Sequence, residues 1–335
     1  MSPILVTGGA GFIGSHLVDE LLAGGHAVRV FDDFSTGRRE NLVQAVALTG
    51  TGAKASALVP AEVRLEVIEG DVRDLEALRA AVDGCAAVVH LAAVASVQAS
   101  YERLDEVNCV NVGGTVKTLR AAREAGVGRV VFASSCAVYG DATDLPIDEA
   151  TATRPLSPYA VGKLAGEGYC CSLASTGEID TVAPRFFNVY GPRQDAASPY
   201  SGVIAAFAAA ASAGRGCIVH GDGEQTRDFV YVGDLVRALV AAATRAERFD
   251  GEVVNLGSGV ETSVNEIVAQ MRRASGAELA VEAGATRTGD IRRSCAAFDR
   301  AETMLHWRPE VTFEQGMSLT WQWYAEQNET PSSAS

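Results

Sequence analysis

The chain has 335 residues, of which 47% are hydrophobic and 21% are charged, and its formal net charge at pH 7 is −14. This composition is that of an ordinary globular protein, long enough for one large core or two modest domains. The acidic balance argues against nucleic acid or an anionic membrane surface as a partner, because both require clustered Lys and Arg. The 7 Cys are odd in number and the 5 His are scattered, so we expect neither a disulfide framework nor a metal site.

The first residues lead directly into the apolar run 4–7, without the basic and apolar regions of a secretory signal. No stretch of about 18 apolar residues occurs, so the sequence predicts no membrane-spanning helix. We therefore expect the protein to work in the cytoplasm.

Short β-branched runs alternate with Ala- and Leu-rich segments of helical period through the first half of the chain. This alternation predicts an α/β fold with a doubly wound parallel sheet covered by helices on both faces. The predicted strands are 4–7, 27–31, 63–69, 86–91 and 129–133, and the predicted helices are 12–23, 75–82, 111–125 and 159–173.

The rhythm of the elements changes after about residue 185. We expect one domain over residues 1–185 and a smaller mixed lobe mainly over 186–325. Residues 230–260 are expected to return to the first domain, because 253–256 resembles another buried strand. Residues 41–61, with Thr-Gly-Thr-Gly at their middle, are interpreted as a surface insertion, and 326–335 as a disordered tail.

A Gly-rich turn, residues 8–14, joins the first strand to the first helix. Its glycines permit a tight turn and a close approach to a pyrophosphate, which the helix N-terminus binds. The pair Asp32-Asp33 ends the second strand, and Asp32 is the better candidate to bond the adenosine ribose. A carboxylate there disfavours a 2′-phosphate, so we expect NAD rather than NADP, although Arg38 and Arg39 lie nearby. Residues 1–185 are thus expected to form a Rossmann-type NAD-binding domain.

Other strand ends extend this cofactor site. Asp71 follows the third strand and either reaches the adenine amino group or caps the next helix, two alternatives that the sequence leaves open. Small residues after the fourth strand let the backbone approach the cofactor. The expected contacts in these regions are Gly8, Gly11, Phe12, Ile13, Gly14, Asp32, Asp33, Ser35, Gly37, Asp71, Val72, Leu91, Ala92 and Ala93.

A catalytic group follows the fifth strand. Ser135 ends that strand region, and Tyr159 and Lys163 stand four residues apart, hence on one helix face. Tyr ionises near pH ~10, and lowering its pKa to about 7 takes roughly 4 kcal/mol of stabilisation of the phenolate. The Lys163 ammonium and the nicotinamide ring are expected to supply it. Ser135 would bond the reacting oxygen and Tyr159 would move its proton, with Tyr159 and Lys163 also contacting NAD.

These motifs resemble the extended short-chain dehydrogenases, specifically the UDP-sugar 4-epimerases, over nearly the whole chain. The stretches 111–115, 185–195, 221–230 and 289–294 carry the same resemblance. It implies a UDP-sugar substrate and inversion at C4 of a UDP-hexose or UDP-N-acetylhexosamine through a transient 4-keto sugar, with NAD retained. It also implies a homodimer that pairs helices 111–125 and 159–173 with their copies.

The resemblance further implies a substrate pocket. Asn188, Arg227 and Arg287 would contact the diphosphate or the sugar, since Arg suits multidentate donation, although surface solubility is the alternative for the two Arg. Small residues at Gly202 and Ser294 would leave room for an N-acetyl group. The implied substrate contacts are Ser96, Ser135, Asn188, Gly202, Val203, Arg227, Arg287, Asp290 and Ser294.

Three positions depart from the family pattern. Related 4,6-dehydratases carry an acid pair where Cys136 and Ala137 stand, and alanine cannot protonate a leaving hydroxyl, so dehydration is disfavoured. Cys136 is interpreted as a structural thiol, with a weak acid as the alternative. Pro184 lacks an N–H, so strand pairing near the nicotinamide is expected to differ.

Two other functions compete with epimerisation. One is a different reaction on a nucleotide sugar, by a UDP-glucuronate epimerase or decarboxylase, a 4,6-dehydratase or a reductase. The other is a catalytically silent NAD-binding module, which the joint presence of Ser135, Tyr159 and Lys163 disfavours.

Overall fold

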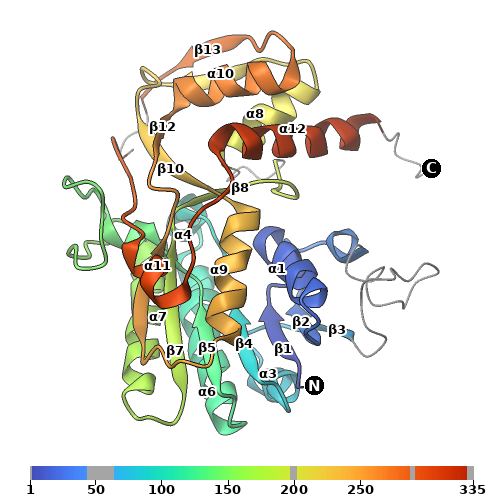
Figure 1. Ribbon diagram of the computed structural model, residues 1–335, viewed down its shortest axis with the longest axis vertical. Coiled ribbons are helices and arrows are strands. Elements are labelled where there is room, and N and C mark those ends of the chain that lie inside the picture. The colour runs from blue at the N-terminus through green and yellow to red at the C-terminus, as the bar shows by residue number, and fades with distance from the viewer. Residues whose placement is uncertain (1, 44–63, 197–201, 287–290, 330–335) are drawn as a thin grey trace.

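The computed structural model of the chain describes residues 2–43, 64–196, 202–286 and 291–329. Its centre is an eight-stranded parallel sheet (Figure 1), which confirms the expected α/β class. The order β3-β2-β1-β4-β5-β7-β11 changes direction between β1 and β4. At such a change, open α/β sheets bind ligands in a crevice outside the carboxyl ends of the strands. The strands are β1 (Ile4–Thr7), β2 (Val28–Asp32), β3 (Leu65–Glu69), β4 (Ala87–His90), β5 (Arg129–Phe132), β6 (Ser134–Ser135), β7 (Asp180–Phe186) and β11 (Glu252–Leu256).

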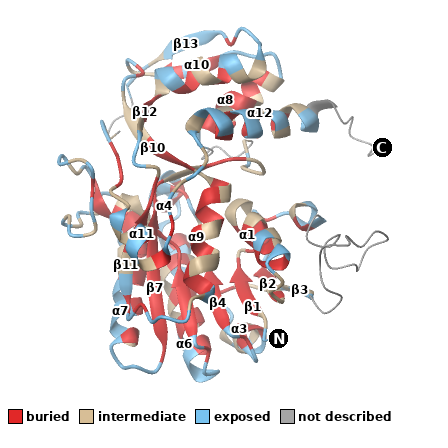
Figure 2. Ribbon diagram, in the orientation of Figure 1, coloured by how far each residue is buried: buried red, intermediate tan, exposed pale blue. Residues whose placement is uncertain are grey.

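Helices cover both faces of this sheet (Figures 1 and 2), and strands β1, β4, β5 and β7 are therefore buried throughout, whereas the edge strand β3 is partly exposed. One core cluster joins the sheet to α1 (Phe12–Ala23), α9 (Val232–Thr244) and α11 (Asp299–Leu305). The opposite cluster joins it to α3 (Leu75–Val82), α6 (Thr115–Glu124) and α7 (Pro158–Ala174). No helix in the described part of the chain is long and apolar enough to cross a membrane.

The pairing of β7 is interrupted at Pro184. Strand β5 pairs with β7 as far as Val131 and Val182, and β6 resumes at Ser134 and Arg185. Pro184 lies at this break, because without an N–H it cannot donate a ladder bond toward β5, while on its other side it stays in register with Val254 of β11. The expected change of pairing is therefore present, and it leaves β6 as a separate strand of two residues that pairs with β7.

The smaller lobe lies above the carboxyl ends of the central strands (Figure 1). A three-stranded sheet contains β8 (Asn188–Tyr190), β10 (Thr226–Tyr231) and β12 (Glu261–Ser263), and a parallel pair contains β9 (Cys217–His220) and β13 (Val281–Gly284). A third core cluster packs them against α8 (Val203–Ser212), α10 (Val264–Ser275) and α12 (Phe313–Glu329).

Most predicted ends lie within one or two residues of the observed ones, and two departures change how a segment is described. The helix expected at 111–125 begins with the wider π-turn Cys109–Gly114 and then continues as α6. Gly114 allows this segment to pack closely, since a Cβ there would lie 2.7 Å from Cγ2 of Val72. Helix α12 continues to Glu329, past the residue where we expect the disordered tail to begin. Residues 44–61 of the interpreted insertion and residues 330–335 lie outside the described residues. Just before residue 44, Arg39–Leu42 form a 3₁₀ turn.

The loop after β8 joins the smaller lobe to helix α1. The ring of His16 lies 2.9 Å from the Pro192 carbonyl oxygen, and Arg193 forms a 2.8 Å ion pair with Asp19 one turn further along the helix. A second ion pair, 3.4 Å long, joins Asp195 to Arg38. Because a carbonyl oxygen only accepts, His16 donates through Nε2, and burial lowers its pKa to about 4.

We expect the free energy of unfolding to fall as the pH drops from 6.5 toward 4. The folded pKa of His16 lies below its unfolded value of 6.5, so in this window the unfolded chain binds a proton that the folded protein excludes. The loss attributable to His16 is roughly 3 kcal/mol, at ~1.4 kcal/mol per pH unit. Urea unfolding of the protein and of His16→Gln across this window would measure it, and the variant should show a shallower dependence.

His306→Asn is the matched control for this experiment. His306 is exposed and has a left-handed backbone with φ of 50°, which Asn tolerates. A slope that changes equally in both variants would contradict the assignment to His16.

Candidate active site

The Gly-rich turn is packed so closely that side chains cannot replace its glycines. Gly8 has φ of +69°, and a Cβ there would lie 2.9 Å from the Ala92 nitrogen. A Cβ on Gly14 would lie 2.1 Å from the Gly8 oxygen. Gly11 is the N-cap residue of α1, so the N–H groups of Phe12 and Ile13 point out of the helix N-terminus. A bare helix N-terminus against a glycine cradle fits a pyrophosphate.

Asp32 and Asp33 take different positions. Asp32 is 6% exposed, and its carboxylate accepts from the Ala10 N–H at 2.9 Å and the Phe34 N–H at 2.8 Å. Burial raises the pKa of Asp32, and these two donors partly offset the rise. Gly37 packs against the same carboxylate, since a Cβ there would lie 2.7 Å from Oδ1. Asp33 is exposed and accepts from Ser35, so Asp32 is the carboxylate that the Gly-rich turn holds in place.

Both arginines near this pair have carboxylate partners. Arg38 pairs with Asp195, and Arg39 pairs with Glu69 at 2.5 Å while covering the ring of Phe34 at 4.0 Å. Guanidinium groups already bonded to carboxylates have less to offer a 2′-phosphate. The structure therefore makes Arg38 and Arg39 weaker candidates to bind the 2′-phosphate of NADP.

Asp71 is not the cap of helix α3. That position belongs to Asp74, whose side chain accepts from the backbone of Glu76 and Ala77. Asp71 instead pairs with Arg73, and this hydrogen bond lowers the pKa of the Asp71 carboxyl. The capping alternative is thus wrong, and the adenine contact of Asp71 stays a prediction. Val72 beside it is buried against Gly114.

A buried polar chain fixes the loop after β4, where Leu91, Ala92 and Ala93 lie. Thr115 donates to the Asn111 carbonyl at 2.6 Å, so it accepts from Nε2 of His90 at 3.1 Å. Nδ1 of His90 then accepts from the Thr7 hydroxyl at 2.7 Å, and that hydroxyl in turn accepts from the Ala92 N–H. Our sequence reasoning missed this chain; its signal was a polar residue, His90, at the end of an otherwise apolar strand.

Ser135, Tyr159 and Lys163 gather at the end of β6 and the start of α7. The Ser157 side chain caps α7 by accepting from the Ala160 N–H, and Pro158 occupies the first turn, so the helix begins just before Tyr159. Lys163 is 6% exposed, and Nζ donates to the Ala133 oxygen at 2.7 Å and lies 5.8 Å from the Tyr159 ring centre.

Burial governs the protonation of this group in the protein alone. It raises the pKa of Tyr159 to about 12, and hydrogen bonding with Ser135 partly offsets the rise. It lowers the pKa of Lys163 to about 8. The stabilisation of the phenolate that we expect from Lys163 is therefore not delivered by the protein alone, because the ammonium is directed at a backbone carbonyl rather than at the phenol oxygen.

Cys136 and Ala137 follow Ser135 in a 3₁₀ turn that the Ser135 side chain caps through the Ala137 N–H. Burial raises the pKa of Cys136 to about 12, and the charge of Asp228 adds to the rise. A thiol with that pKa is a poor proton donor at neutral pH, which favours the structural interpretation of Cys136 over the weak acid.

The implied substrate residues lie in the smaller lobe and along the crevice. Asn188 begins β8 directly after β7, and its side-chain amide donates to the backbone carbonyl oxygen of Asp228 at 3.3 Å. Arg227 precedes Asp228 in β10. Gly202 caps α8 and Val203 begins it. Ser96 and Ser294 are both buried, and Ser96 also caps α4 (Val97–Glu102). Arg287 and Asp290 lie outside the described residues.

One principle brings most of these residues together. The Gly-rich turn, Asp32, Asp71, the 91–93 loop, Ser135 and Asn188 each follow the carboxyl end of a strand in the parallel sheet. Such ends meet at one edge of a sheet, where open α/β folds bind their ligands. The residues present thus fit a dinucleotide bound across the change of strand order. Among the described residues, no group of three His, Cys, Asp or Glu converges as metal ligands.

Comparisons with known proteins identify the family of the chain. The model of the NAD dependent epimerase/dehydratase family matches residues 4–257. The chain is 41% identical to a UDP-glucose 4-epimerase of Mycolicibacterium smegmatis over 94% of this chain and 96% of that protein. It is 34% identical to a UDP-N-acetyl-alpha-D-glucosaminuronate decarboxylase of Bacillus cytotoxicus, over 96% and 97%.

Solved structures lead to the same family. A UDP-N-acetylglucosamine 4-epimerase from Methanobrevibacter ruminantium M1, in complex with UDP-N-acetylmuramic acid, superimposes with a TM-score of 0.87 at 32% identity, covering 97% of this chain and 99% of that one. The matches run through both the sheet and the smaller lobe. The chain therefore belongs to the NAD-dependent epimerase/dehydratase family, as an extended short-chain dehydrogenase whose cofactor is NAD.

Proposed function

We propose that the protein inverts C4 of a UDP-hexose or a UDP-N-acetylhexosamine through a transient 4-keto sugar. The observation that carries the proposal is the surroundings of Ser135 and Tyr159. Alcohol oxidation needs one group that moves a proton, and Tyr159 with Ser135 provides it. Dehydration needs an acid for the leaving hydroxyl as well. Ala137 cannot be that acid, and Cys136, with a pKa of about 12, is a poor one.

In this reaction each of three residues would have a separate role. Ser135 bonds the C4 oxygen, and Tyr159 takes the hydroxyl proton and holds it on its phenol oxygen. Bound NAD would supply the hydride acceptor for C4, and its positive ring would favour the phenolate form of Tyr159. Lys163, held by the Ala133 carbonyl, adds positive charge at the same end of the site. Tyr159 then gives the proton back once the ketone has turned its other face, so no net oxidation occurs.

Decarboxylation of a nucleotide sugar is the second candidate. It is favoured by the 34% identity to a decarboxylase over nearly the whole chain. Both reactions begin with oxidation at C4, so the two candidates share the roles of Ser135, Tyr159 and Lys163.

The direct test incubates the purified protein with UDP-GlcNAc and, separately, UDP-glucose, with no added cofactor, and follows both by proton NMR. We expect the galacto epimer to appear and Tyr159→Phe to lower its rate at least about 100-fold while bound NAD is unchanged. Tyr169→Phe is the matched control, since Tyr169 lies on the same helix and is 45% exposed. If neither substrate is epimerised, the same assay is run with UDP-glucuronate, and a decarboxylated or 4-keto product from it would contradict the proposal.

Residue 294 is proposed to set the size of the sugar pocket. Ser294 is 7% exposed, so a larger side chain there would take up space inside the protein. We expect Ser294→Tyr to lower turnover of N-acetylated substrates about 10-fold more than that of plain hexoses, because one extra group in a filled pocket costs on the order of 1–3 kcal/mol. Ser294→Ala should leave the ratio unchanged; an equal loss on both substrates in Ser294→Tyr would refute this role.

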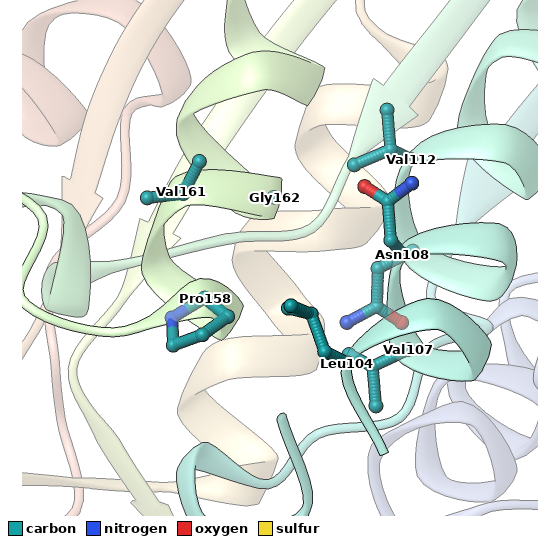
Figure 3. A pocket seen from close by; sticks show the side chains of 8 residues that line it. Leu104, Val107, Asn108, Val112, Pro158, Val161 and Gly162 are labelled. Atoms are coloured by element: carbon teal, nitrogen blue, oxygen red, sulfur yellow. The ribbon is translucent and has the colours of Figure 1, made fainter. Parts of the chain in front are cut away.

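The proposed dimer uses an apolar face on α7 and its neighbours. A cavity of about 270 Å³ opens there, lined by Leu104, Val107, Asn108, Asn111, Val112, Pro158, Val161 and Gly162 (Figure 3). None of the candidate catalytic residues lines it. Leu104 and Val161 are both 53% exposed, and Tyr101 near them is 61% exposed. A second copy of the chain would cover these side chains. Helices α6 and α7 of the two copies would then pack together as a four-helix arrangement.

We expect Val161→Asp to convert the dimer to a monomer, because the substitution places a charge in the centre of the apolar face. Sedimentation equilibrium would measure the mass. Val260→Asp, at a valine that is 57% exposed in the other lobe, should leave the dimer intact. A wild-type protein that sediments as a monomer would overturn the proposed interface.

A further inference from the structure

The backbone alone holds Ser135 weakly. Strand β6 contains Ser134 and Ser135, and the pairing interrupted opposite Pro184 separates it from the ladder of β5. In the described residues β6 pairs with β7 and with no other strand. A hydroxyl that must lie within hydrogen-bond distance of both Tyr159 and a substrate needs a firmer support.

Side chains supply that support from one buried cluster. The Ser134 hydroxyl donates to Oε1 of Glu167 at 2.5 Å. Arg185 holds the same carboxylate with two bonds, from Nε to Oε1 at 2.8 Å and from Nη2 to Oε2 at 2.7 Å. Arg185 is also the residue that pairs with Ser134 across the sheet. Ser134, Glu167 and Arg185 therefore close a triangle, and they are 2%, 5% and 5% exposed.

The same arginine also holds the turn that follows Ser135. Its Nη1 donates to the Tyr139 hydroxyl at 2.9 Å, and the guanidinium lies 4.7 Å from the centre of that ring. Tyr139 in turn donates to Oδ1 of Asn255 in β11 at 2.7 Å. Ser135 is thus tied to Arg185 on both sides, through Ser134 before it and Tyr139 after it.

Helix α7 connects this cluster to the catalytic group. Tyr159, Lys163 and Glu167 follow one another at intervals of four residues, so all three lie on one face of α7. Lys163 bonds the Ala133 carbonyl and Glu167 bonds the Ser134 hydroxyl. Two consecutive residues before Ser135 are therefore attached to the helix that carries Tyr159.

We propose that Ser134, Glu167 and Arg185 are positioning residues, which set the distance between the Ser135 and Tyr159 hydroxyls by joining β6 to α7. The inference rests on the proposed catalytic roles of Ser135 and Tyr159. A buried ion pair is not needed for stability as such, because apolar residues of similar volume often serve as well. The pair of Glu167 and Arg185 also bonds Ser134, the residue before Ser135. It can therefore fix the position of Ser135 relative to α7.

Ser134→Ala is the mildest test, since it removes one hydroxyl and leaves both bonds between Glu167 and Arg185. We expect kcat to fall about 10-fold with KM within about 2-fold, because the interaction of Ser135 with the reacting oxygen is strongest in the transition state. We also expect the pKa of Tyr159 in the NAD-bound protein to rise by about 0.5 unit, since its hydrogen bond with Ser135 weakens. Ser134→Cys keeps a weak donor and should give intermediate values.

Thr181→Val is the matched control. The Thr181 hydroxyl is also fully buried and also joins β7 to α7, through a 2.8 Å bond to the Cys170 oxygen, but far along the helix from Tyr159. It should cost similar stability in urea unfolding and change neither kcat nor the titration of Tyr159. Equal kinetic effects in the two variants, or a Ser134→Ala enzyme with unchanged kcat and unchanged titration, would overturn the proposal.

The titration separates this inference from the proposed function. It is read as the ultraviolet difference between each NAD-bound protein and its counterpart that also carries Tyr159→Phe, and it needs no substrate. If no sugar is epimerised but the Tyr159 titration shifts in Ser134→Ala alone, the epimerase proposal fails and the positioning role stands. If the protein epimerises its substrate but Ser134→Ala changes neither kcat nor the Tyr159 titration, the epimerase proposal stands and the positioning role fails.

Discussion

The close packing of helix α1 on strand β1 is the constraint on which the rest of the site depends. A Cβ at position 14 would lie 2.1 Å from the Gly8 oxygen, and one at position 8 would lie 2.9 Å from the Ala92 nitrogen. A side chain at position 14 would push the helix away from the turn and withdraw its N-terminal N–H groups, and one at position 8 would displace the loop after β4. The loop after β4 is then held against the same turn by Thr7 and His90.

Helix α7 takes part in two of our proposals, one on each face. Its inner face carries Tyr159, Lys163 and Glu167; Lys163 bonds the Ala133 oxygen, and Glu167 bonds Ser134 and Arg185. Its outer face contributes Pro158, Val161 and Gly162 to the apolar cavity. A second copy packed on the outer face would therefore immobilise the helix that holds the proposed base, which links the oligomeric state to the geometry of the reaction.

The fold itself does not choose among the reactions of this family. Relatives named as an epimerase and as a decarboxylase both match almost the entire chain. Function must therefore be argued from individual positions on a shared scaffold. Our proposal for this chain rests on Cys136 and Ala137, which follow Ser135, and on Gly202 and Ser294.

The sequence by itself determined the parallel sheet, the Gly-rich turn after β1, the acidic residue ending β2 and the Tyr159–Lys163 pair. These are local patterns, in which the periodicity of apolar residues or a spacing of a few residues carries the information. Strands 4–7 and helices 12–23 and 75–82 have the predicted bounds for that reason.

Only the tertiary structure decided which polar residues are partners. It assigned the cap of α3 to Asp74 instead of Asp71, gave Arg38 and Arg39 their carboxylates, and turned Lys163 toward a backbone carbonyl. It also joined Ser134 to Glu167, and His16 to a carbonyl 176 residues away. Such bonds depend on the distance and direction between atoms that the chain brings together from separate elements, and no spacing along the sequence encodes them.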